Sequence, residues 1–362
     1  MKNNSILIFR NFNDPILKTA WIKLENEIDA FPQMFYEWIE PWWRYNSRNR
    51  KLHIVAVVNE CGKIVGIAPF CIEKRFGLKI LRSIPIHFGD FYSMLVDHGN
   101  VGELICQIKD YTLTFKTWSI VHYYNINSSS IEALNLKAFK KRKITDILVT
   151  HFERLTLNQF LLSLSKNTRD QYKKKLNRLN KAGLIQLEVI TDPTDYIRNF
   201  ENTREIYNLR WANDLRPLLS DDYYSMRNEA LLPMFRSGKA VLYNLRFNGS
   251  VIAFRLGFLH KNTFYDWKVS HDPKYDYYSP GFILVGKVIE DLMLRGYVRL
   301  NFMTGNYRYK RSWINNNTIS SNFEFLSSKK YSLGVLYIFY RLHLREKVRE
   351  FYYKWVKIII SK

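Results

Sequence analysis

The sequence predicts an α+β fold built from mixed sheets and amphipathic helices, and three observations carry that prediction. β-rich runs meet at short turns, because Asn248-Gly249 lies between two such runs and a glycine-containing loop at 59–63 lies between two others. Apolar residues recur at helical spacing between the β-rich runs, most clearly from Val285 to Leu292. The length of 362 residues, with 47% hydrophobic residues, indicates about two domains with cores of their own.

The first 150 residues are predicted to form one compact α+β unit. Helical spacing runs over 17–28 and 35–45, and Pro41 is expected either to break the second helix or to begin a new turn. The predicted strands are 52–58, 64–70, 79–84, 91–96 and 117–121, and a helix is predicted over 101–110. We expect two strand pairs, 52–58 with 64–70 and 79–84 with 91–96. The basic run from Lys140 to Lys143 is interpreted as a solvated surface.

Residues 151–184 differ from their surroundings because a basic helix dominates them. Ser165 begins this helix, Gly183 ends it, and the residues between are rich in lysine and arginine. Such a helix can bind nucleic acid, a phosphorylated substrate or a membrane surface, and it can equally be a solvated connector between domains. The sequence leaves these alternatives open.

Residues 185–330 predict a second α+β unit, and residues 331–362 predict a basic tail. The order expected in the second unit is a strand, two helices, three strands, a helix, a strand, a short helix and a final strand near 321–325. An apolar stripe at helical spacing runs through the tail: Leu344, Val348, Phe351, Trp355 and Ile359. The tail therefore suits an anionic bilayer surface, with packing of the stripe on the folded domain as the alternative.

The helix around which the second unit is organised begins at Ser279-Pro280-Gly281. Ser279 suits an N-cap, Pro280 fits the first helical turn, and Gly281 lets a ligand approach the backbone. Gly296 stands where a helix-ending glycine belongs. A helix N-terminus of this kind suits a phosphate or pyrophosphate, although the same residues can simply begin a helix.

The charge of the chain restricts the classes of partner that it is expected to bind. Lys+Arg number 55 against 33 Asp+Glu, so the net charge is +22, which favours nucleic acid, acidic lipid or a phosphorylated cofactor. The three cysteines form no Cys-x-x-Cys pair, so we expect ordinary thiols in a reducing cytoplasm and no metal site. No apolar run reaches the length of a membrane span, and the first residues are too polar for a signal peptide. The expected location is the cytoplasm, with peripheral contact with the inner membrane left open.

Four stretches together carry a resemblance to a known family. They are Ser165-Lys166-Asn167-Thr168-Arg169 with the basic helix, the pair Arg210-Trp211, Tyr278-Ser279-Pro280-Gly281, and the run from Gly305 to Trp313. In order and spacing they resemble the CelD-type (BioF-like) GNAT acetyltransferases, bacterial proteins linked to polysaccharide biosynthesis that look like distant relatives of the FemAB aminoacyltransferases. The resemblance implies two GNAT-like units in tandem: an N-terminal domain over 1–150, a connector over 151–184, a domain with the acyl-CoA loop over 185–330, and the amphipathic helix over 331–362.

The chain departs from that family at two positions. Asn301 stands where an Asp is common before the Phe of the fifth strand, and Asn306 stands where an acidic residue often follows the glycine. Each change removes a possible general base. The first unit also shows no glycine-bearing helix start comparable with that at Gly281, so we interpret it as a substrate-side or structural half.

Acyl transfer from a thioester needs a base for the acceptor, a polarised carbonyl and an acid for the leaving thiolate. In GNAT-like folds the acceptor usually attacks directly, so no nucleophilic Ser or Cys is required. The candidate bases are Asp266, inside the strand before the loop, and Asp272, before Pro273; the candidate acids are Tyr307 and Tyr309. Each has a structural alternative, since Asp266 can pair with a core Lys or Arg, Asp272 can hold a turn, and the tyrosines can simply pack.

The remaining candidate residues bind rather than react. Those expected to hold the phosphates of acetyl-CoA, the expected co-substrate, are Ser279, Pro280, Gly281, Lys310 and Arg311, of which the last two suit an anionic acceptor equally well. Those expected to contact the acceptor are Arg169, Arg210 and Trp211.

The expected function is acetyl-CoA-dependent N- or O-acetylation of a sugar, nucleotide-sugar or polysaccharide precursor. Two alternatives stay open. One is a FemAB-like transferase that uses aminoacyl-tRNA to modify a cell-wall precursor, which the charge of +22 would suit. The other is a non-catalytic protein that binds the membrane surface, which Asn301 and Asn306 keep open.

Overall fold

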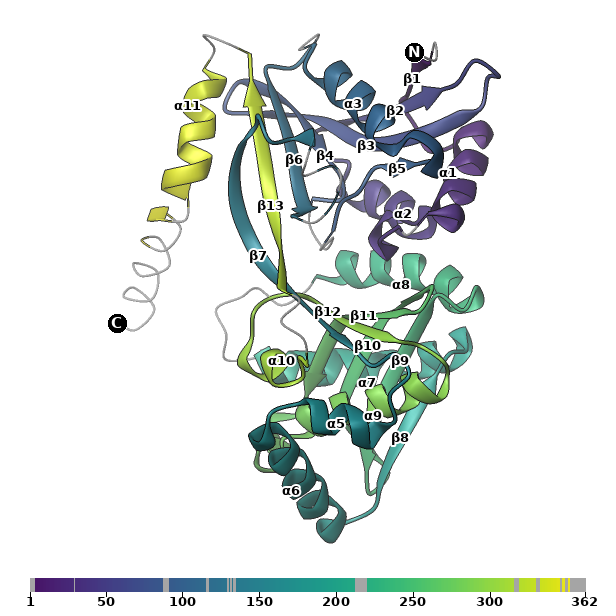
Figure 1. Ribbon diagram of the computed structural model, residues 1–362, viewed down its shortest axis with the longest axis vertical. Helices are drawn as coiled ribbons and strands as arrows, with labels where there is room; N and C mark the ends of the chain where they lie inside the picture. Colours follow the sequence, from purple (N-terminus) through teal and green to yellow (C-terminus); the bar gives the residue numbers. More distant parts are fainter. Residues whose placement is uncertain are drawn as a thin grey trace. The chain divides into compact units, whose positions relative to one another are not determined.

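The chain folds into two units (Figure 1). The computed structural model describes residues 4–28, 30–86, 91–114, 117–128, 130, 132, 135–211, 220–315, 319–329, 333–345, 347–348 and 351. Unit 1 comprises Met1–Tyr36, Asn46–Ile144 and Ser321–Lys362, and unit 2 comprises Glu37–Tyr45 and Thr145–Ser320. None of the helices in the described ranges is long and apolar enough to cross a membrane.

The sheet of unit 1 is mixed. Its strand order is β1-β2-β3-β4-β6-β13, with β4 and β6 parallel and the other neighbours antiparallel. The strands are β1 (Ser5–Phe9), β2 (Arg50–Val58), β3 (Ile64–Arg75), β4 (Leu78–Ser83), β6 (Ile120–Asn127) and β13 (Ile319–Ser328). The short β5 (Leu95–Val96) pairs with β3 at Ile67 and Gly66.

The helices α1 (Pro15–Glu27) and α3 (Val101–Thr112) of unit 1 each bury an apolar face. α1 begins at Asp14, whose carboxylate accepts the N–H groups of Ile16 and Leu17 at 2.9 and 3.2 Å. Trp21 in the middle of α1 is fully buried. The other helical segments are η1 (Pro32–Met34), η2 (His98–Asn100), α11 (Gly334–Phe339) and η4 (Tyr340–Leu344), of which η4 is a π-helix.

The sheet of unit 2 repeats the same plan. Its strand order is β7-β12-β11-β10-β9-β8, with β11 and β12 parallel and the other neighbours antiparallel. The strands are β7 (Lys140–His151), β8 (Ile185–Ile190), β9 (Ala240–Phe247), β10 (Ser250–His260), β11 (Thr263–His271) and β12 (Arg299–Thr304). The β9–β10 turn has Asn248 and Gly249 at positive φ, as an Asn-Gly hairpin requires.

Helices cover both faces of the sheet in unit 2. On one face α5 (Leu157–Ser163), α6 (Lys166–Ala182) and α9 (Pro280–Leu294) share a core with the strands, in which Tyr243 and Val288 are fully buried. On the other face α7 (Pro193–Trp211) lies against β10 and β11, and its Asn199 accepts a hydrogen bond from Asn244 at 3.2 Å. The remaining helices are α2 (Tyr36–Asn46), α8 (Asp221–Arg236), η3 (Pro273–Tyr278) and α10 (Arg308–Ser312).

The same order of elements occurs twice along the chain. In each copy a strand is followed by two helices, three antiparallel strands, a helix and a strand parallel to the third of those three, although α2, the second helix of the first copy, belongs to unit 2. The sixth strand is exchanged, because β7 pairs with β12 in unit 2 while β13 pairs with β6 in unit 1. The predicted α+β class with mixed sheets and tandem halves is therefore confirmed.

Local predictions held where a turn or a periodicity signals the element, and failed for distant pairings. The hairpins β2–β3 and β9–β10 and the helix α9 form as predicted. The expected pairing of 79–84 with 91–96 is wrong, since both segments pair with β3. The run 140–143 is the start of β7, and Pro41 lies inside α2 without ending it. Of the predicted tail stripe, Leu344, Val348 and Phe351 are described, whereas Trp355 and Ile359 lie outside the described residues.

Candidate active site

The candidate site of unit 2 is the place where its two parallel strands separate. β11 and β12 pair at three positions only: Thr263 with Arg299, Phe264 with Leu300, and Tyr265 with Asn301. Beyond them β12 also loses its register with β7 between Asn301 and Thr304, where Met303 has a φ of 57°. Backbone groups that leave a sheet in this way need other partners, so polar side chains are expected to gather here.

A buried ion pair stands directly at the separation. Asp266, the first residue of β11 beyond the paired region, contacts Nη1 of Arg255 from β10, and the two residues are 3% and 2% exposed. Nη2 of Arg255 also donates to the carbonyl of Gly281 at 3.2 Å. Burial raises the pKa of Asp266 above its ordinary value and outweighs the opposing effects of Arg255 and Lys310. The Oδ1 atom of Asp266 is buried without a hydrogen-bond partner.

Lys310 contacts the last residues of β12. Its ammonium donates to the carbonyls of Phe302 at 2.6 Å and Thr304 at 2.7 Å, and the residue is 6% exposed. The neighbouring Tyr309 has its ring centre 5.8 Å from the Arg255 guanidinium, and burial raises its pKa to about 12. Tyr307 is half exposed and stacks on the Tyr309 ring with centroids 6.3 Å apart. Asp266 and Tyr309, predicted separately from the sequence, thus both lie against Arg255, and the charge of Lys310 acts on Asp266.

The start of α9 differs from the predicted N-cap. Ser279 has a left-handed φ of 56° and its side chain makes no capping hydrogen bond. Pro280 has no N–H, and the N–H of Phe282 is donated to the carbonyl of Ser279 at 3.0 Å, so the first turn offers an anion little beyond the N–H of Gly281. A Cβ at Gly281 would lie 3.3 Å from Nδ1 of His271, so the imidazole stands over this glycine.

A hollow of about 500 Å³ opens beside Tyr309. It is lined by α6, α9 and α10 through Asn167, Thr168, Gln171, Lys175, Phe282, Arg308, Tyr309 and Ser312. The Lys175 ammonium lies 4.6 Å from the centre of the Phe282 ring, and burial lowers the pKa of Lys175. The hollow therefore joins two cationic side chains, Lys175 and Arg308, to the tyrosine of the buried cluster.

The remaining predicted residues do not join the cluster. Asp272 caps η3 by accepting the N–H of Lys274 at 2.9 Å. Arg169 donates to the carbonyls of Leu162 and Leu164 at 3.1 and 3.3 Å, at the end of α5. Arg210 pairs with Asp276 at 3.6 Å, and Asp276 also accepts from His271 at 2.6 Å. Trp211 ends α7, and residues 212–219 after it lie outside the described part of the chain.

Asn301 and Asn306, which stand where the resemblance implies carboxylates, have structural partners. Oδ1 of Asn301 accepts the N–H of Met303 at 2.9 Å, which holds the bend in β12. Asn306 donates to Asp146 of β7 at 2.8 Å and accepts from Nε of Arg311. Arg311 is thereby tied to the loop after β12. Sequence reasoning missed Arg255 altogether, although an arginine inside the apolar run of β10 was the available signal.

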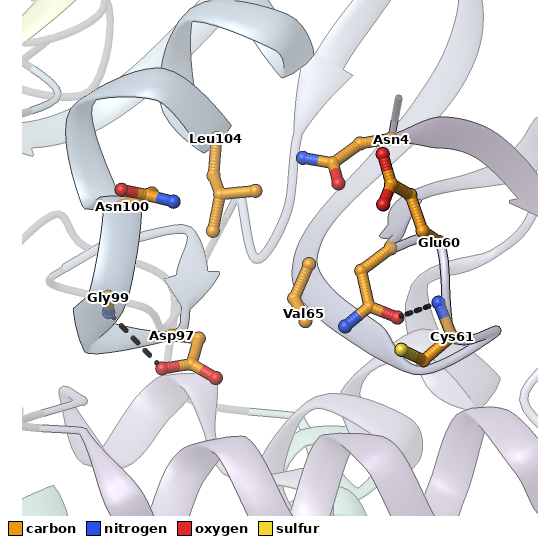
Figure 2. A pocket seen from close by; sticks show the side chains of 9 residues that line it. Asn4, Glu60, Cys61, Val65, Asp97, Gly99, Asn100 and Leu104 are labelled. Atoms are coloured by element: carbon orange, nitrogen blue, oxygen red, sulfur yellow. Dashed lines mark hydrogen bonds between the residues drawn. The ribbon is translucent and has the colours of Figure 1, made fainter. Parts of the chain in front are cut away.

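The helix start in unit 1 that corresponds to the start of α9 differs from it in the charge of its surroundings. α3 has Gly102 in its first turn and follows Gly99, so unit 1 does contain a glycine-bearing helix start, contrary to the sequence analysis. Figure 2 shows the hollow of about 230 Å³ beside it, which is lined by the carboxylates of Asp97 and Glu60. Asp97 accepts the N–H of Gly99 at 3.3 Å and pairs with Lys63 at 3.7 Å. Carboxylates at this helix start disfavour a phosphate.

Comparison with known proteins identifies the fold. Residues 166–311 match the family model described as an acetyltransferase (GNAT) domain. No curated protein matches the sequence. The structure of FemX is similar with a TM-score of 0.65 at 11% identity, over 89% of this chain and 98% of that one.

Two further structures are similar at the level of the fold. The C-terminal domain of a lysylphosphatidylglycerol synthetase from Agrobacterium fabrum has a TM-score of 0.57 at 12% identity, over 89% of this chain and 94% of that one. L-PGS from Bacillus licheniformis has a TM-score of 0.54 at 14% identity, over 92% of this chain and 98% of that one. The fold of the chain is therefore tandem GNAT-like, and its residues 166–311 match the model of an acetyltransferase (GNAT) domain.

Proposed function

We propose that unit 2 transfers an acyl group from an activated carrier to an amine or hydroxyl acceptor where β11 and β12 separate. The observation that carries this proposal is the buried group of Asp266, Arg255, Tyr309 and Lys310 at that separation. It combines a carboxylate with an unpartnered oxygen, two cations and a protonated phenol inside a GNAT-type domain. These are the groups that direct acyl transfer requires.

Each residue has a distinct proposed role. Oδ1 of Asp266 accepts the proton that the acceptor loses on attack, and the raised pKa of this carboxyl favours holding it. The positive charge of Lys310, fixed by two carbonyls of β12, stabilises the oxyanion of the tetrahedral intermediate. Tyr309 donates its proton to the leaving group, because a phenol with a pKa of about 12 stays protonated near neutral pH.

We favour aminoacyl-tRNA as the donor and a cell-wall or lipid precursor as the acceptor. A nucleic-acid donor suits the net charge of +22 and the exposed lysines of α6, among them Lys173 and Lys174. The fold similarity to FemX and to two lysylphosphatidylglycerol synthetase structures supports the same donor class. The crowded start of α9, where His271 stands over Gly281, is a poor cradle for a pyrophosphate.

Acetyl-CoA with a sugar-type acceptor is the second candidate. The match of residues 166–311 to an acetyltransferase domain favours it, and Lys175 and Arg308 line a hollow in which CoA phosphates can be held. A purely non-catalytic role gains no support from Asn301, because its side chain holds the bend in β12.

The test compares both donors on the same protein. Purified protein is mixed with bulk aminoacyl-tRNA, and release of the amino acid to water is followed in the absence of an acceptor; acetyl-CoA binding is followed by calorimetry. We expect deacylation faster than the spontaneous rate, and loss of that acceleration in Asp266→Asn. Saturable acetyl-CoA binding without tRNA deacylation would favour the second candidate, and activity with neither donor would overturn the proposal.

A matched pair of glycine variants locates the donor. Gly281→Asp places a carboxylate in the first turn of α9, and Gly102→Asp places one in the first turn of the equivalent α3, where a Cβ meets no atom within 4 Å. A donor phosphate at α9 predicts weaker binding for Gly281→Asp alone. Equal binding by both variants would place the donor phosphates elsewhere, with the hollow at Lys175 as the next site to change.

A further inference from the structure

The C-terminal segment of unit 1 is attached to the sheet by one of its faces. Tyr337 and Ile338 of α11 are buried in an apolar cluster with Ile80, Ile120 and Leu326 of the sheet. In Figure 1 α11 is the yellow helix near the C-terminus. The packing of this face supplies the apolar burial that a helix of this length needs to form.

An ion pair fixes the same face. Arg341 of η4 is 2% exposed, and its Nε and Nη2 both contact Oε2 of Glu324 on β13 at 2.8 Å. A buried bidentate pair holds the helix at a fixed rotation about its axis, so the opposite face has a defined direction.

The opposite face is apolar and exposed. Its members are Leu333 (68% exposed), Leu336 (66%), Phe339 (56%), Leu344 (41%), Val348 (53%) and Phe351 (64%). Phe339 and Leu344 are five residues apart and still share this face, because the π-helix between them adds one residue to the turn. The exposed stripe therefore continues across the π-helix, and we call these six residues the tail face.

The tip of the β3–β4 hairpin adjoins the tail face. Phe76, at this tip, is 71% exposed and has a φ of 49°. Its ring meets that of Tyr340 edge-on with centroids 6.4 Å apart. Two elements that are distant in sequence thus expose large apolar side chains side by side, which isolated surface apolar residues do not do.

The charge around these residues is positive. Lys74, Arg75 and Lys79 are exposed on the hairpin beside Phe76. Over 329–362 lysine and arginine outnumber glutamate by nine to two, and aspartate does not occur. Exposed cations beside an exposed apolar stripe, in a segment with an excess of lysine and arginine, complement an anionic lipid surface, whereas two copies of this face would bring like charges together.

We propose that the tail face and Phe76 dock unit 1 on an anionic lipid bilayer. The apolar side chains enter the boundary between headgroups and acyl chains, and the lysines and arginines remain at the level of the lipid phosphates. This binding surface lies in unit 1 and does not depend on the acyl transfer proposed for unit 2.

Vesicle binding by the full chain tests the proposal. Co-sedimentation is measured with vesicles of phosphatidylcholine mixed with phosphatidylglycerol, and with phosphatidylcholine alone. We expect salt-sensitive binding to the anionic vesicles, and at least about tenfold weaker partition for Phe339→Glu, because its ring no longer enters the bilayer. The matched control is Ile16→Glu, which makes the same charge change at a residue that is 66% exposed on α1 of the same unit.

Three outcomes of these measurements would contradict the proposal. Absence of wild-type binding to anionic vesicles overturns it. An equal loss in Ile16→Glu reduces the effect to net charge and overturns the assigned surface. A wild-type dimer in light scattering that Phe339→Glu dissociates assigns the face to a second copy instead. Should Phe339→Glu lower the thermal midpoint, Leu336→Ser is measured in its place, since Leu336 is more exposed.

Discussion

Replacement of Glu324 by glutamine is expected to destabilise unit 1 strongly. The buried carboxylate accepts from Nε of Arg142 at 2.6 Å, from Arg341 at 2.8 Å and from Nε2 of His122 at 2.9 Å. Glutamine keeps the shape of the side chain but leaves the buried guanidinium of Arg341 and the partly exposed guanidinium of Arg142 without a counter-charge. Breaking a buried pair in this way costs about 3–5 kcal/mol, which corresponds to a urea midpoint lower by about 2 M at an m-value of about 2 kcal/mol/M. Urea unfolding followed by circular dichroism measures the shift.

The pH dependence of that loss provides a second, independent check. Burial by itself raises the pKa of Glu324, but His122, Arg341 and Arg142 outweigh it and hold the pKa well below the ordinary 4.5. A depressed folded pKa stabilises the protein above the unfolded pKa, and this contribution is lost as the pH falls further. The gap between wild type and Glu324→Gln should therefore narrow below about pH 4.5. The control Glu290→Gln removes the exposed partner of Lys287 and should cost less than about 0.5 kcal/mol. A loss under about 1 kcal/mol at neutral pH, or a gap that stays constant in acid, would refute the reasoning.

Three further substitutions test the site and the sheet of unit 2. Asp266→Asn should slow acyl transfer by about 10²–10⁴-fold in single-turnover assays, and a rate within a factor of about three of wild type would remove Asp266 as the base. Tyr309→Phe should slow release of the leaving group by about 10²-fold while the thermal midpoint stays unchanged; an unchanged rate would assign the tyrosine to packing. Gly257→Ala should cost more than about 2 kcal/mol in urea unfolding, because its Cβ would collide with the carbonyl of Tyr265, whereas Gly102→Ala, with open space around it, should be tolerated. Comparable stabilities of the two alanine variants would contradict the close approach at Gly257.

The sequence was informative wherever a short segment carries its own signal. Asn248-Gly249 specifies its hairpin because both residues accept positive φ. β7 was missed because its first residues read as a basic surface, and Arg142 among them pairs with Glu324, a residue 182 positions away. The pairing of 79–84 was missed for the same reason, since β3 and β6 become its neighbours only through tertiary structure. Propensity and turn chemistry act over a few residues, and they do not encode such partners.

The residues of the candidate site show the same difference between local signals, which the sequence reveals, and long-range contacts, which it does not. Asp266, Tyr309 and Lys310 were singled out as residue types near the loop, but their convergence depends on the point at which β11 leaves β12. The role of Ser279 was mistaken because its suitability as an N-cap rests on a side-chain hydrogen bond, while the left-handed backbone there directs the side chain elsewhere. Arg255 was the clearest signal that sequence reasoning overlooked, because this charged residue lies between fully buried residues of its strand.

Comparison of the two units shows how the carboxylate that we propose as the base differs from a structural one. Both units bury an ion pair between their third and fourth strands: Glu73 with Arg82 in unit 1, at 3.0 Å, and Arg255 with Asp266 in unit 2. Burial raises the pKa of each carboxyl, but Glu73 also contacts Arg50, and the two guanidinium groups together bring its pKa below the ordinary value. Asp266 keeps a raised pKa and a buried oxygen without a partner. An ion pair that served only to hold the sheet would gain stability from a second donor, as Glu73 does. The unit that lacks that donor is the one whose sequence matches an acyltransferase domain, and the unpartnered oxygen is the one a proton acceptor needs.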